Sequence, residues 1–493
     1  MAHTEADTKT PPLTAGLRAR VGRALAWNLS FNLVRDVLQF GVTLILVRLL
    51  DPAAYGMAAL VNGGIAFLAV FSLNAFLAHG LQLEEGREVD YQSHFTVGGF
   101  QQGALFLIAQ LAGLGLWWSE DYEAIAPLVH FYAFRLLLDW PGELRRAMLQ
   151  RGLDWSRLVF LDTAGLLAGA LLGLVLAWSG AGVYALLAPG LVTPLALAVD
   201  LFLLARWRPE FRFDALGHAP ALAFGLRRMG SLAADRGRTL LETALVVHLA
   251  GFAATGLFGR ANALAALFCQ RLAVQAMAAI YPAFARMDAT DHRYRDLGLR
   301  ALQGVFWLAL PMGVLLAGLA EPAVRIVYGA QWLQAAELLP PAVGLSVLAA
   351  MSHVGYLLLL GANGQDDCLR ADLLRLLLVV PALIWVLPRG LAMYLWSIAG
   401  LELLVLAYLL RTLFARSLLN GGDLLRALWP ALFSALLALA LAKGLSARAG
   451  FEGGAESLLY SAVFVSVYGL ALWYLFPSAS RRFLRALPWR WQQ

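Results

Sequence analysis

Apolar stretches long enough to cross a lipid bilayer recur along the whole chain. Hydrophobic residues make up 60% of the 493 residues, and charged residues only 14%. A transmembrane helix needs about 20 mainly apolar residues to cross the hydrocarbon core, and the runs reach that length repeatedly. This composition excludes a soluble globular protein. The sequence therefore predicts an all-α polytopic membrane protein.

About fourteen transmembrane helices are predicted from these runs. They lie near residues 25–50, 53–80, 95–118, 123–144, 158–178, 183–205, 222–249, 253–281, 300–320, 337–360, 371–388, 391–411, 425–443 and 457–476. No loop between them is long enough to fold as a catalytic domain. The longest external connection, residues 320–337, has the size of a re-entrant or interfacial turn.

The basic residues indicate how these helices are oriented. The formal net charge of +6 comes from arginine, because Lys9 and Lys443 are the only lysines. With the N-terminus in the cytoplasm, most basic residues between spans fall on the inner side, as the positive-inside rule requires. The basic residues on the outer side are Arg48, Arg325, Arg389, Lys443 and Arg448. Both termini are therefore predicted to be cytoplasmic, and basic residues confined to short loops exclude a nucleic-acid partner.

The first predicted span carries a polar stripe. Its members follow the spacing i, i+4, i+7 and i+11, which places them on one helical face. They are Asn28, Asn32, Arg35 and Gln39. Asp36 lies at the edge of the stripe, and Thr43 follows further along. A face of this kind cannot be turned to lipid, so it is predicted to line a bundle interior or a water-filled cavity.

The same stretch recurs 200 residues later. The matching residues are Thr43, Val47, Leu49, Ala53, Ala54, Gly56 and Asn62, which fall on Thr243, Val247, Leu249, Ala253, Ala254, Gly256 and Asn262. The shift also lays the charged pair Arg35-Asp36 on Asp235-Arg236. Because six spans, an even number, separate the copies, both enter the membrane in the same direction. The pattern predicts two parallel six-helix repeats related by an axis along the membrane normal.

These features divide the chain into six predicted segments. The lobes are residues 25–205 and 222–411, joined by residues 206–221, a basic and aromatic linker that is predicted to lie on the inner membrane surface. A basic cytoplasmic tail, 1–24, precedes the lobes. Two helices without partners in the repeat, 412–476, are appended, and residues 477–493 form a basic and aromatic cytoplasmic tail.

Further charged residues fall inside the predicted seventh and eighth spans. Asp235, Arg238 and Glu242 share a helical face, whereas Arg236 points about 100° away from it. A charge at the helix centre costs about 2.5–3.5 kcal/mol on insertion scales, so each needs a compensating interaction. One interpretation is that these residues pair between helices and hold the bundle together. The other is that surplus arginines bind an anion, since a guanidinium grips phosphate oxygens with two parallel hydrogen bonds.

The remaining polar residues inside spans include an undecided group and several residues with predicted structural roles. Arg260, Arg271 and Gln275 lie on one stripe of the eighth span and leave both interpretations open. Arg135 and Asp139 are predicted to form a structural i, i+4 pair. Three isolated carboxylates, Asp162, Asp200 and Glu402, are expected to make interhelical hydrogen bonds rather than to carry a coupling ion. The histidines and the cysteines Cys269 and Cys368 show no metal or disulfide spacing, so no metal and no cofactor are expected.

Five stretches together resemble the polysaccharide-transporter branch of the multidrug/oligosaccharidyl-lipid/polysaccharide (MOP) flippase superfamily. They are LVRLLDPAAYGMAAL (46–60), ELRRAMLQRGLDWSRL (143–158), GFAATGLFGRANAL (251–264), IYPAFARM (280–287) and VRIVYGAQWLQAAELL (324–339). Phe258 stands where this family commonly has tyrosine. The order and spacing of the stretches are specific, and the likeness covers about 20–480. It is greatest to exporters of the colanic-acid type, which share two extra C-terminal spans.

The resemblance implies a fold and a transport activity. The fold would be two six-helix lobes, of the kind found in multidrug (MATE) transporters and lipid II flippases, around a central cavity that opens alternately to either side. The activity would be movement of an undecaprenyl-pyrophosphate-linked oligosaccharide across the bacterial inner membrane for O-antigen or exopolysaccharide export. Membrane lipids and, transiently, polysaccharide polymerase machinery would be its other partners. The chain would not be an enzyme. Asp235 matches an acidic position that is common in the family.

Combining the two lines of reasoning gives a predicted site. The substrate-binding candidates are Arg35, Arg236, Arg238, Asn28, Asn32, Gln39, Arg260 and Arg271. The candidates for charge balance or ion coupling are Asp36, Asp235 and Glu242. Two alternatives within transport are a lipid II flippase and a cation-coupled multidrug antiporter, although surplus arginine disfavours a cationic drug. A membrane polymerase or ligase would need a sizeable external loop, which this sequence lacks.

The predicted topology can be tested by labelling single cysteines in whole cells. After replacement of Cys269 and Cys368, a cysteine placed within residues 145–157 is expected to be protected from a membrane-impermeant reagent added outside. A cysteine within residues 320–337 is expected to react. Lysed cells provide the control, because both positions should then be labelled. Reaction of residues 145–157 in intact cells would contradict the orientation.

Overall fold

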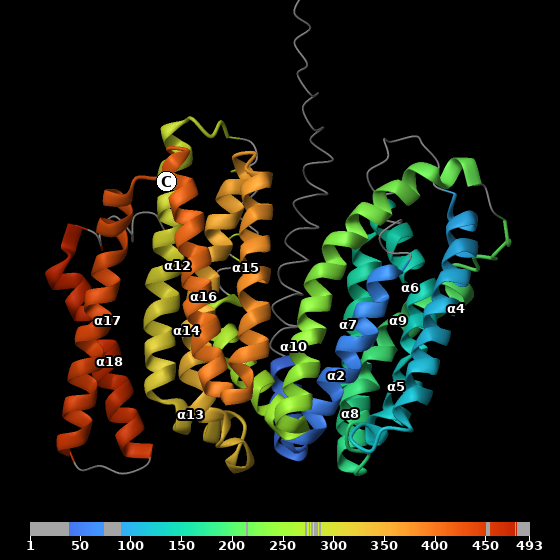
Figure 1. Cartoon of the computed structure of the whole chain (residues 1–493), viewed down its shortest axis with the longest axis horizontal. Helices are drawn as coiled ribbons and strands as arrows, with labels where there is room; N and C mark the ends of the chain where they lie inside the picture. Colours follow the sequence, from blue (N-terminus) through green and yellow to red (C-terminus); the bar gives the residue numbers. More distant parts are fainter. Residues whose placement is uncertain are drawn as a thin grey trace, which may run out of the picture. The chain divides into compact units, whose positions relative to one another are not determined.

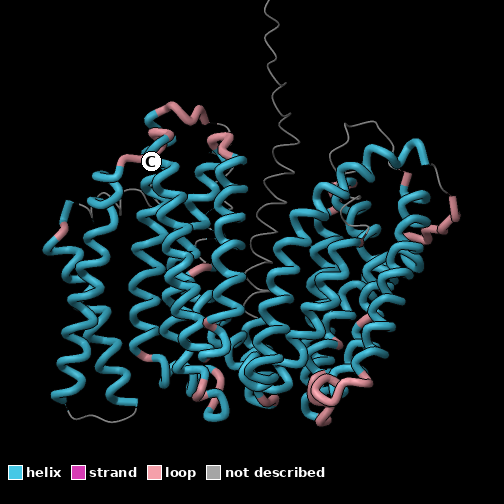
Figure 2. The backbone as a smooth tube through the Cα atoms, viewed as in Figure 1, coloured by secondary structure: helices cyan, strands magenta, loops and turns pink. Residues whose placement is uncertain are grey.

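The computed structural model describes a chain whose regular elements are helices. The described residues are 39–72, 90–212, 215–271, 287–449 and 454–478, with the single positions 274, 275, 277, 280, 284 and 480. Within them the tube in Figure 2 shows helices and connecting loops only. Ten of these helices are long and apolar enough to cross a membrane, and Gln39–Leu49 and Pro189–Leu204 are shorter apolar helices. The all-α membrane class is confirmed, whereas the number fourteen stays a prediction.

The described chain divides into two compact units. Unit 1 contains the described residues up to Leu50 together with Leu60–Leu240, and unit 2 contains Asp51–Ala59 and the described residues from Leu241 onward. Helix α2 (Pro52–Leu68) therefore begins in unit 2 and continues into unit 1. Helix α10 (Ala215–Cys269) begins in unit 1 and continues into unit 2.

Unit 1 is a bundle whose helices pack through small residues. Its further elements are α4 (Tyr91–Leu116), η2 (Glu123–Ile125), α5 (Ala126–Tyr132), α6 (Phe134–Arg151), α7 (Trp155–Trp178), α8 (Tyr184–Leu187), α9 (Pro189–Val199) and η3 (Asp200–Leu204). Helix α6 packs against α4 and α9, and α7 packs against α9 (Figure 1). A Cβ atom at Gly165 would lie 2.8 Å from Thr193, and one at Gly169 2.9 Å from the Pro189 carbonyl oxygen. These two glycines therefore let α7 and α9 approach each other closely.

Unit 2 is built around α14, which packs against several neighbouring helices. Its elements are α12 (His292–Gly318), α13 (Ala320–Val327), η4 (Ala330–Trp332), α14 (Ala335–Gly361), α15 (Gln365–Trp385), η5 (Leu387–Arg389), α16 (Leu391–Ala415), α17 (Gly421–Ala449) and α18 (Gly454–Leu475). Helix α14 contacts α12, α15 and α16. The predicted interfacial turn at residues 320–337 contains the short helix α13 and the turn η4.

Aromatic residues fasten the last two helices to α12. The Trp307 indole donates a hydrogen bond to the Ala427 carbonyl oxygen at 2.8 Å, and the Tyr468 hydroxyl donates to the Trp307 carbonyl oxygen at 3.0 Å. Tyr460 packs over Gly318, where any side chain would overlap its ring. Figure 1 shows α17 and α18 as a pair beside α12. These helices are the pair predicted to be appended to the repeat.

The two copies of the repeat meet at a reciprocal crossing of helices. A Cβ atom at Gly56 would lie 1.9 Å from the Phe252 carbonyl oxygen, and one at Gly256 would lie 1.9 Å from the Pro52 carbonyl oxygen. Residues 52 and 56 thus contact residues 256 and 252, their own counterparts 200 positions away, as across a two-fold axis. All four residues belong to unit 2. The crossing supports the 200-residue repeat read from the sequence.

A glycine break in α10 precedes this crossing. Gly251 has φ +85 and ψ 173, a backbone conformation that other residues rarely adopt. The sequence predicted two spans, 222–249 and 253–281, with a break between them. The break is confirmed at Gly251.

The connection predicted after the fourth span, residues 145–157, is largely helical. Helix α6 continues to Arg151, so Arg145 and Arg146 are helical, and only residues 152–154 connect it to α7. Leu153 adopts φ +55, and the Asp154 side chain accepts a hydrogen bond from the Arg157 backbone N–H to begin α7. The helix extends this far because Arg145 and Arg146 have carboxylate partners on neighbouring helices, as described below.

The crossing predicts that Gly56 tolerates no side chain. Gly56→Ala should lower the midpoint of thermal unfolding in detergent, because overpacking two backbones typically costs about 1–3 kcal/mol. Gly64→Ala on the same helix is the matched control, since no atom lies within 4 Å of a Cβ there. It should be neutral or slightly stabilising. Unfolding is followed by tryptophan fluorescence. Equal midpoints for the two variants would contradict the close approach of the two helix backbones.

Candidate functional site

Asp235, Arg236 and Arg238 lie close together on α10, before the break at Gly251. Asp235 is 63% exposed and Arg238 28% exposed, and their side chains form an ion pair at 3.8 Å. Arg236 is exposed, and within the described residues it has no ion-pair or hydrogen-bond partner. An exposed i, i+3 pair of this length contributes well below 1 kcal/mol in water. Asp235 is therefore paired with Arg238, whereas Arg236 is exposed beside them, and their predicted roles in charge balance and anion binding stay predictions.

Glu242 lies beyond this group and belongs to unit 2. Its carboxylate accepts a hydrogen bond from the Tyr394 hydroxyl of α16 at 2.9 Å. The ring of Tyr394 also contacts Phe258, with ring centroids 6.3 Å apart. Glu242 is thereby held against the helices of unit 2. Tyr394 was not identified from the sequence, because its distance from Glu242 along the chain hides the contact.

Arg260 is enclosed by aromatic residues that follow the crossing. Its guanidinium lies 4.8 Å from the ring centroid of Tyr55, and Tyr55 meets Trp332 edge-on at 5.3 Å. Tyr328 donates a hydrogen bond to the Arg260 backbone carbonyl oxygen at 3.1 Å. Within the described residues no carboxylate pairs with Arg260, and the buried Tyr55 hydroxyl has no hydrogen-bond partner. We call Tyr55, Tyr328 and Trp332 the aromatic collar of Arg260.

Most of the predicted stripe of the first span lies outside the described residues. These residues are Asn28, Asn32, Arg35 and Asp36. Gln39 is exposed at the start of the helix Gln39–Leu49. The Thr43 hydroxyl donates to the Gln39 carbonyl oxygen at 2.7 Å, one turn back. Arg271 is exposed just beyond the end of α10.

Two carboxylates in unit 1, the buried Asp200 and the half-buried Asp162, bind arginines from other helices. Asp200, 1% exposed, accepts hydrogen bonds from Arg145 at 2.6 Å and from Arg157 at 2.7 Å. Asp162 on α7 binds Arg146 on α6 through two hydrogen bonds of 2.7 and 2.9 Å. The predicted interhelical bonding of both carboxylates is confirmed. The arginine partners of these carboxylates could not be identified from the sequence, since they come together only when α6, α7 and α9 pack.

A second polar chain in unit 1 joins α2, α5 and α6. Arg135 donates to the Tyr132 hydroxyl at 2.5 Å, and that hydroxyl donates to Asn62 at 3.1 Å. Arg135 also forms an ion pair with Asp139 at 3.5 Å. The predicted structural pair is confirmed, with Tyr132 and Asn62 as partners that the sequence did not reveal.

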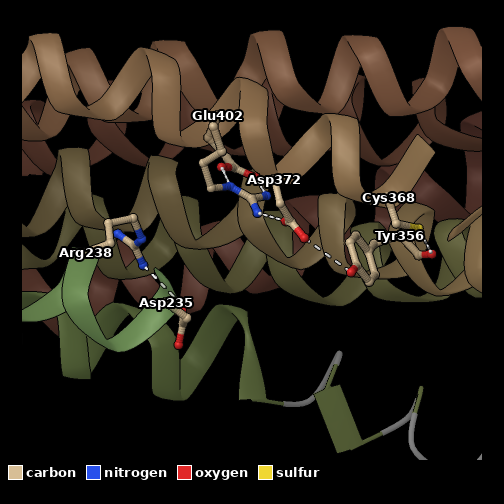
Figure 3. A network of polar contacts seen from close by, with 7 residues as sticks. Asp235, Arg238, Tyr356, Cys368, Asp372 and Glu402 are labelled. Carbon is tan, nitrogen blue, oxygen red and sulfur yellow. Dashed lines mark hydrogen bonds and ion pairs between the residues drawn. The ribbon is translucent and has the colours of Figure 1, made fainter. Parts of the chain in front are cut away.

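The carboxylate of Glu402 in unit 2 is bound by an arginine in the same way. Arg375 on α15 donates to both oxygens of Glu402 on α16, at 2.9 and 3.0 Å. Arg375 also reaches Asp372 at 3.3 Å, and Asp372 accepts from the Tyr356 hydroxyl at 3.3 Å. Figure 3 shows Glu402, Asp372 and Tyr356 in one network of polar contacts. The predicted interhelical hydrogen bonding of Glu402 is confirmed.

These contacts separate two kinds of charged residue. Arginines such as Arg146 and Arg375 are fully engaged by carboxylates on neighbouring helices. Arg236 and Arg260 have no carboxylate partner within the described residues. No group of histidine, cysteine or acidic residues in the described part of the chain is arranged to hold a metal ion. A guanidinium group without a carboxylate partner is chemically suited to bind an anion.

A family model for polysaccharide biosynthesis proteins matches residues 45–337, which is more than half of the chain. Two curated relatives are similar in sequence. The succinoglycan biosynthesis transport protein ExoT of Rhizobium meliloti is 24% identical over 320 residues, which are 64% of each chain. The lipopolysaccharide biosynthesis protein WzxC of Escherichia coli is 23% identical over 287 residues, or 57% of each chain. The matches span less than two thirds of the relatives' own length.

Two solved structures share the fold. The lipid II flippase MurJ, in an inward closed conformation, has a TM-score of 0.69 at 12% identity, covering 92% of this chain and 99% of its own. An inward-facing multidrug resistance MATE family transporter of the MOP superfamily has a TM-score of 0.52 at 16% identity, covering 78% and 95%. The relatives named for an activity are transport proteins or flippases rather than catalysts. The chain belongs to the polysaccharide biosynthesis protein family and has the fold of MOP-superfamily transporters.

Proposed function

We propose that this protein is a flippase for lipid-linked oligosaccharides. Its cargo would be undecaprenyl-pyrophosphate-linked repeat units, carried from the cytoplasmic to the outer leaflet of the inner membrane for export of O-antigen or exopolysaccharide. The observation that carries the proposal is family membership, together with relatives named for succinoglycan transport and lipopolysaccharide biosynthesis. The fold shared with MurJ supports a mechanism by rearrangement of two lobes.

The reciprocal crossing supports alternating access as the mechanism. Two helices whose backbones touch at Gly56 and Gly256 leave no space for cargo between them. The crossing lies at the predicted outer ends of α2 and of the second part of α10, so it would close the outer side. Release of cargo to the outer leaflet would then require the crossing to separate. The aromatic collar of Arg260 adds a second contact that must break.

Arginine side chains suit the headgroup of such a cargo. A pyrophosphate carries its negative charge on oxygens that a planar guanidinium can bind in pairs. Arg236 and Arg238 on α10, with Arg35 of the first span, are proposed to hold it. Asp235 would balance Arg238 in the absence of cargo, as its ion pair indicates. Asn28, Asn32 and Gln39 would offer hydrogen bonds to sugar, and the polyprenyl tail would remain in lipid.

A lipid II flippase is the alternative that one observation favours. MurJ covers 92% of this chain, whereas the curated polysaccharide relatives cover less of it. Both cargoes contain a polyprenyl pyrophosphate, so the arginines do not distinguish them. Complementation does: rescue of a strain lacking its lipid II flippase would favour the alternative, and restored surface polysaccharide in a strain lacking its exporter would favour the proposal.

The charges at Arg35, Arg236 and Arg238 are predicted to be needed for transport and not for folding. Replacement of each by alanine should reduce polysaccharide export strongly while the protein still inserts and accumulates. Replacement by lysine should restore only part of it, because an ammonium keeps the charge but loses the paired hydrogen bonds. The measurement is surface polysaccharide per unit of membrane-inserted protein.

A structural arginine gives the opposite result and serves as the control. Arg375→Ala leaves the buried Glu402 without its partner, so the protein itself should fail to accumulate. Wild-type export by a stable variant lacking Arg35, Arg236 and Arg238 would exclude the anion-binding mechanism.

The ring of Tyr55 is predicted to matter more than its hydroxyl. Tyr55→Phe should retain wild-type stability and export, because the hydroxyl it removes is buried without a partner. Tyr55→Leu should lower the unfolding midpoint, since it removes a cation–π contact of about 0.5–2 kcal/mol and the edge contact with Trp332. Thermal unfolding and export are measured for both variants. Identical behaviour of the two would show that the collar does not hold Arg260.

A further inference from the structure

The chain leaves the apolar helix Pro189–Leu204 through a short basic segment, residues 206–212, which we call the basic segment. The helix ends in the wide turn η3, and Arg206 then reverses the chain with φ +51. Every residue of the basic segment except Trp207 is exposed. The sequence WRPEFR at 207–212 contains two further arginines and one glutamate, so the whole segment carries a net charge of two positive.

Hydrogen bonds from α4 fix the shape of the basic segment. The Gln92 side chain donates to the Arg208 carbonyl oxygen at 3.0 Å and accepts from the Glu210 N–H at 2.7 Å. The amide of Gln92 therefore bonds one carbonyl group and one N–H group of the segment's backbone, as the backbone of a neighbouring β-strand would. The Thr96 hydroxyl accepts a hydrogen bond from the Arg212 N–H at 3.0 Å. Three backbone positions of an otherwise irregular segment are held in place.

Aromatic packing holds the base of the basic segment on unit 1. The ring of Trp207 meets Phe95 of α4 at 5.1 Å and Phe202 at 6.5 Å. Phe95 is 3% exposed and is stacked on Trp140 of α6 at 4.2 Å. Trp207 is thus the anchor, and the charged side chains on either side of it extend outward.

The basic segment lies at the boundary between lipid and water. Leu203 and Leu204, directly before it, are 68% and 65% exposed and belong to an apolar helix. In a membrane protein such side chains contact lipid. A helix rises about 1.5 Å per residue, so Arg206 follows this lipid-facing surface within a few ångströms. Phe211, 76% exposed, is an aromatic residue of the kind enriched at membrane interfaces.

The guanidinium groups of the basic segment form no ion pairs within the described residues. Within the described residues no carboxylate lies within ion-pair distance of Arg206, Arg208 or Arg212. The nearby Asp90 already accepts two hydrogen bonds from Ser93 at the start of α4. Burial by itself raises the pKa of Asp90, but those hydrogen bonds and the charge of Arg212 outweigh it and leave the pKa below its usual value.

We propose that the basic segment is a preformed docking site for anionic lipid headgroups on the inner membrane surface. Three outward guanidinium groups would bind phosphate oxygens of lipids in the adjoining leaflet, and Phe211 would insert among the headgroups. Because Gln92 and Thr96 hold the backbone in advance, little conformational entropy is lost on binding. The exposed apolar surface before Arg206 favours a lipid over a soluble anion, because the tail of a lipid would contact that surface and a soluble anion would not.

The test compares lipid retention by the full-length protein in nanodiscs of phosphatidylcholine with a minor fraction of phosphatidylglycerol. The variant Arg206→Asn, Arg208→Gln, Arg212→Gln removes the charges, with asparagine chosen because it tolerates the positive φ of residue 206. Phosphatidylglycerol co-purified per protein, relative to phosphatidylcholine, should fall by about tenfold or more, since each of the three arginines adds to the attraction of anionic lipid. Gln92→Leu keeps every charge but removes two hydrogen bonds, and should cause a smaller loss.

The matched control removes three exposed arginines from elsewhere on the chain. Arg293, Arg295 and Arg300 lie at the start of α12, are exposed and have no ion pair within the described residues, so their replacement by glutamine should leave retention unchanged. An equal loss in this control would overturn the proposal by showing a general effect of net charge. Displacement of the lipid by inorganic pyrophosphate would also overturn it, because the site would then bind soluble anions. An unchanged unfolding midpoint of Gln92→Leu establishes that any loss reflects the segment and not folding.

Discussion

The absence of water in the bilayer core determines how this protein is built. A backbone in hydrocarbon must satisfy its own hydrogen bonds, which helices do, and a charge there must have a partner. Asp200 illustrates the second requirement: it is 1% exposed and is bound by Arg145 and Arg157. Glu402 and Arg375 form the corresponding pair in unit 2. Such pairs position helices relative to one another, because a helix that moved away would leave an uncompensated charge.

A second consequence of the bilayer is that its helices must pack closely without a strong hydrophobic effect to drive them together. Lipid tails are as apolar as leucine, so helices in a membrane gain stability where small residues let their backbones approach. The stripe Gly165, Gly169 on α7 is a permanent contact of this type within unit 1. The crossing at Gly56 and Gly256 uses the same principle between the two copies of the repeat. The two helix backbones approach closely at these glycines. Neither glycine has a side chain that could form an ion pair across the contact.

The distribution of arginines connects this architecture to transport. Arginines such as Arg145 and Arg375, which are bound to carboxylates on neighbouring helices, are part of the structure of their bundle. Arg236 and Arg260 have no carboxylate partner within the described residues, and one is exposed on α10 while the other is enclosed by aromatic rings. The proposed binding of an anionic cargo would use such guanidinium groups. The arginines of the basic segment form a third group, exposed after Leu204.

Four features could be derived from the sequence, because each is a pattern along the chain. They are the membrane class, the helix between Gly251 and Cys269, the 200-residue repeat and the family. Apolar length fixes a transmembrane helix, and glycine permits the backbone at Gly251. The partners of Asp162, Asp200 and Glu402 could not be derived in this way. Several arginines were equally available to each carboxylate, and only the packing of helices far apart in sequence selects one. For the same reason the collar around Arg260, built from Tyr55 and Trp332, was decided by tertiary structure alone.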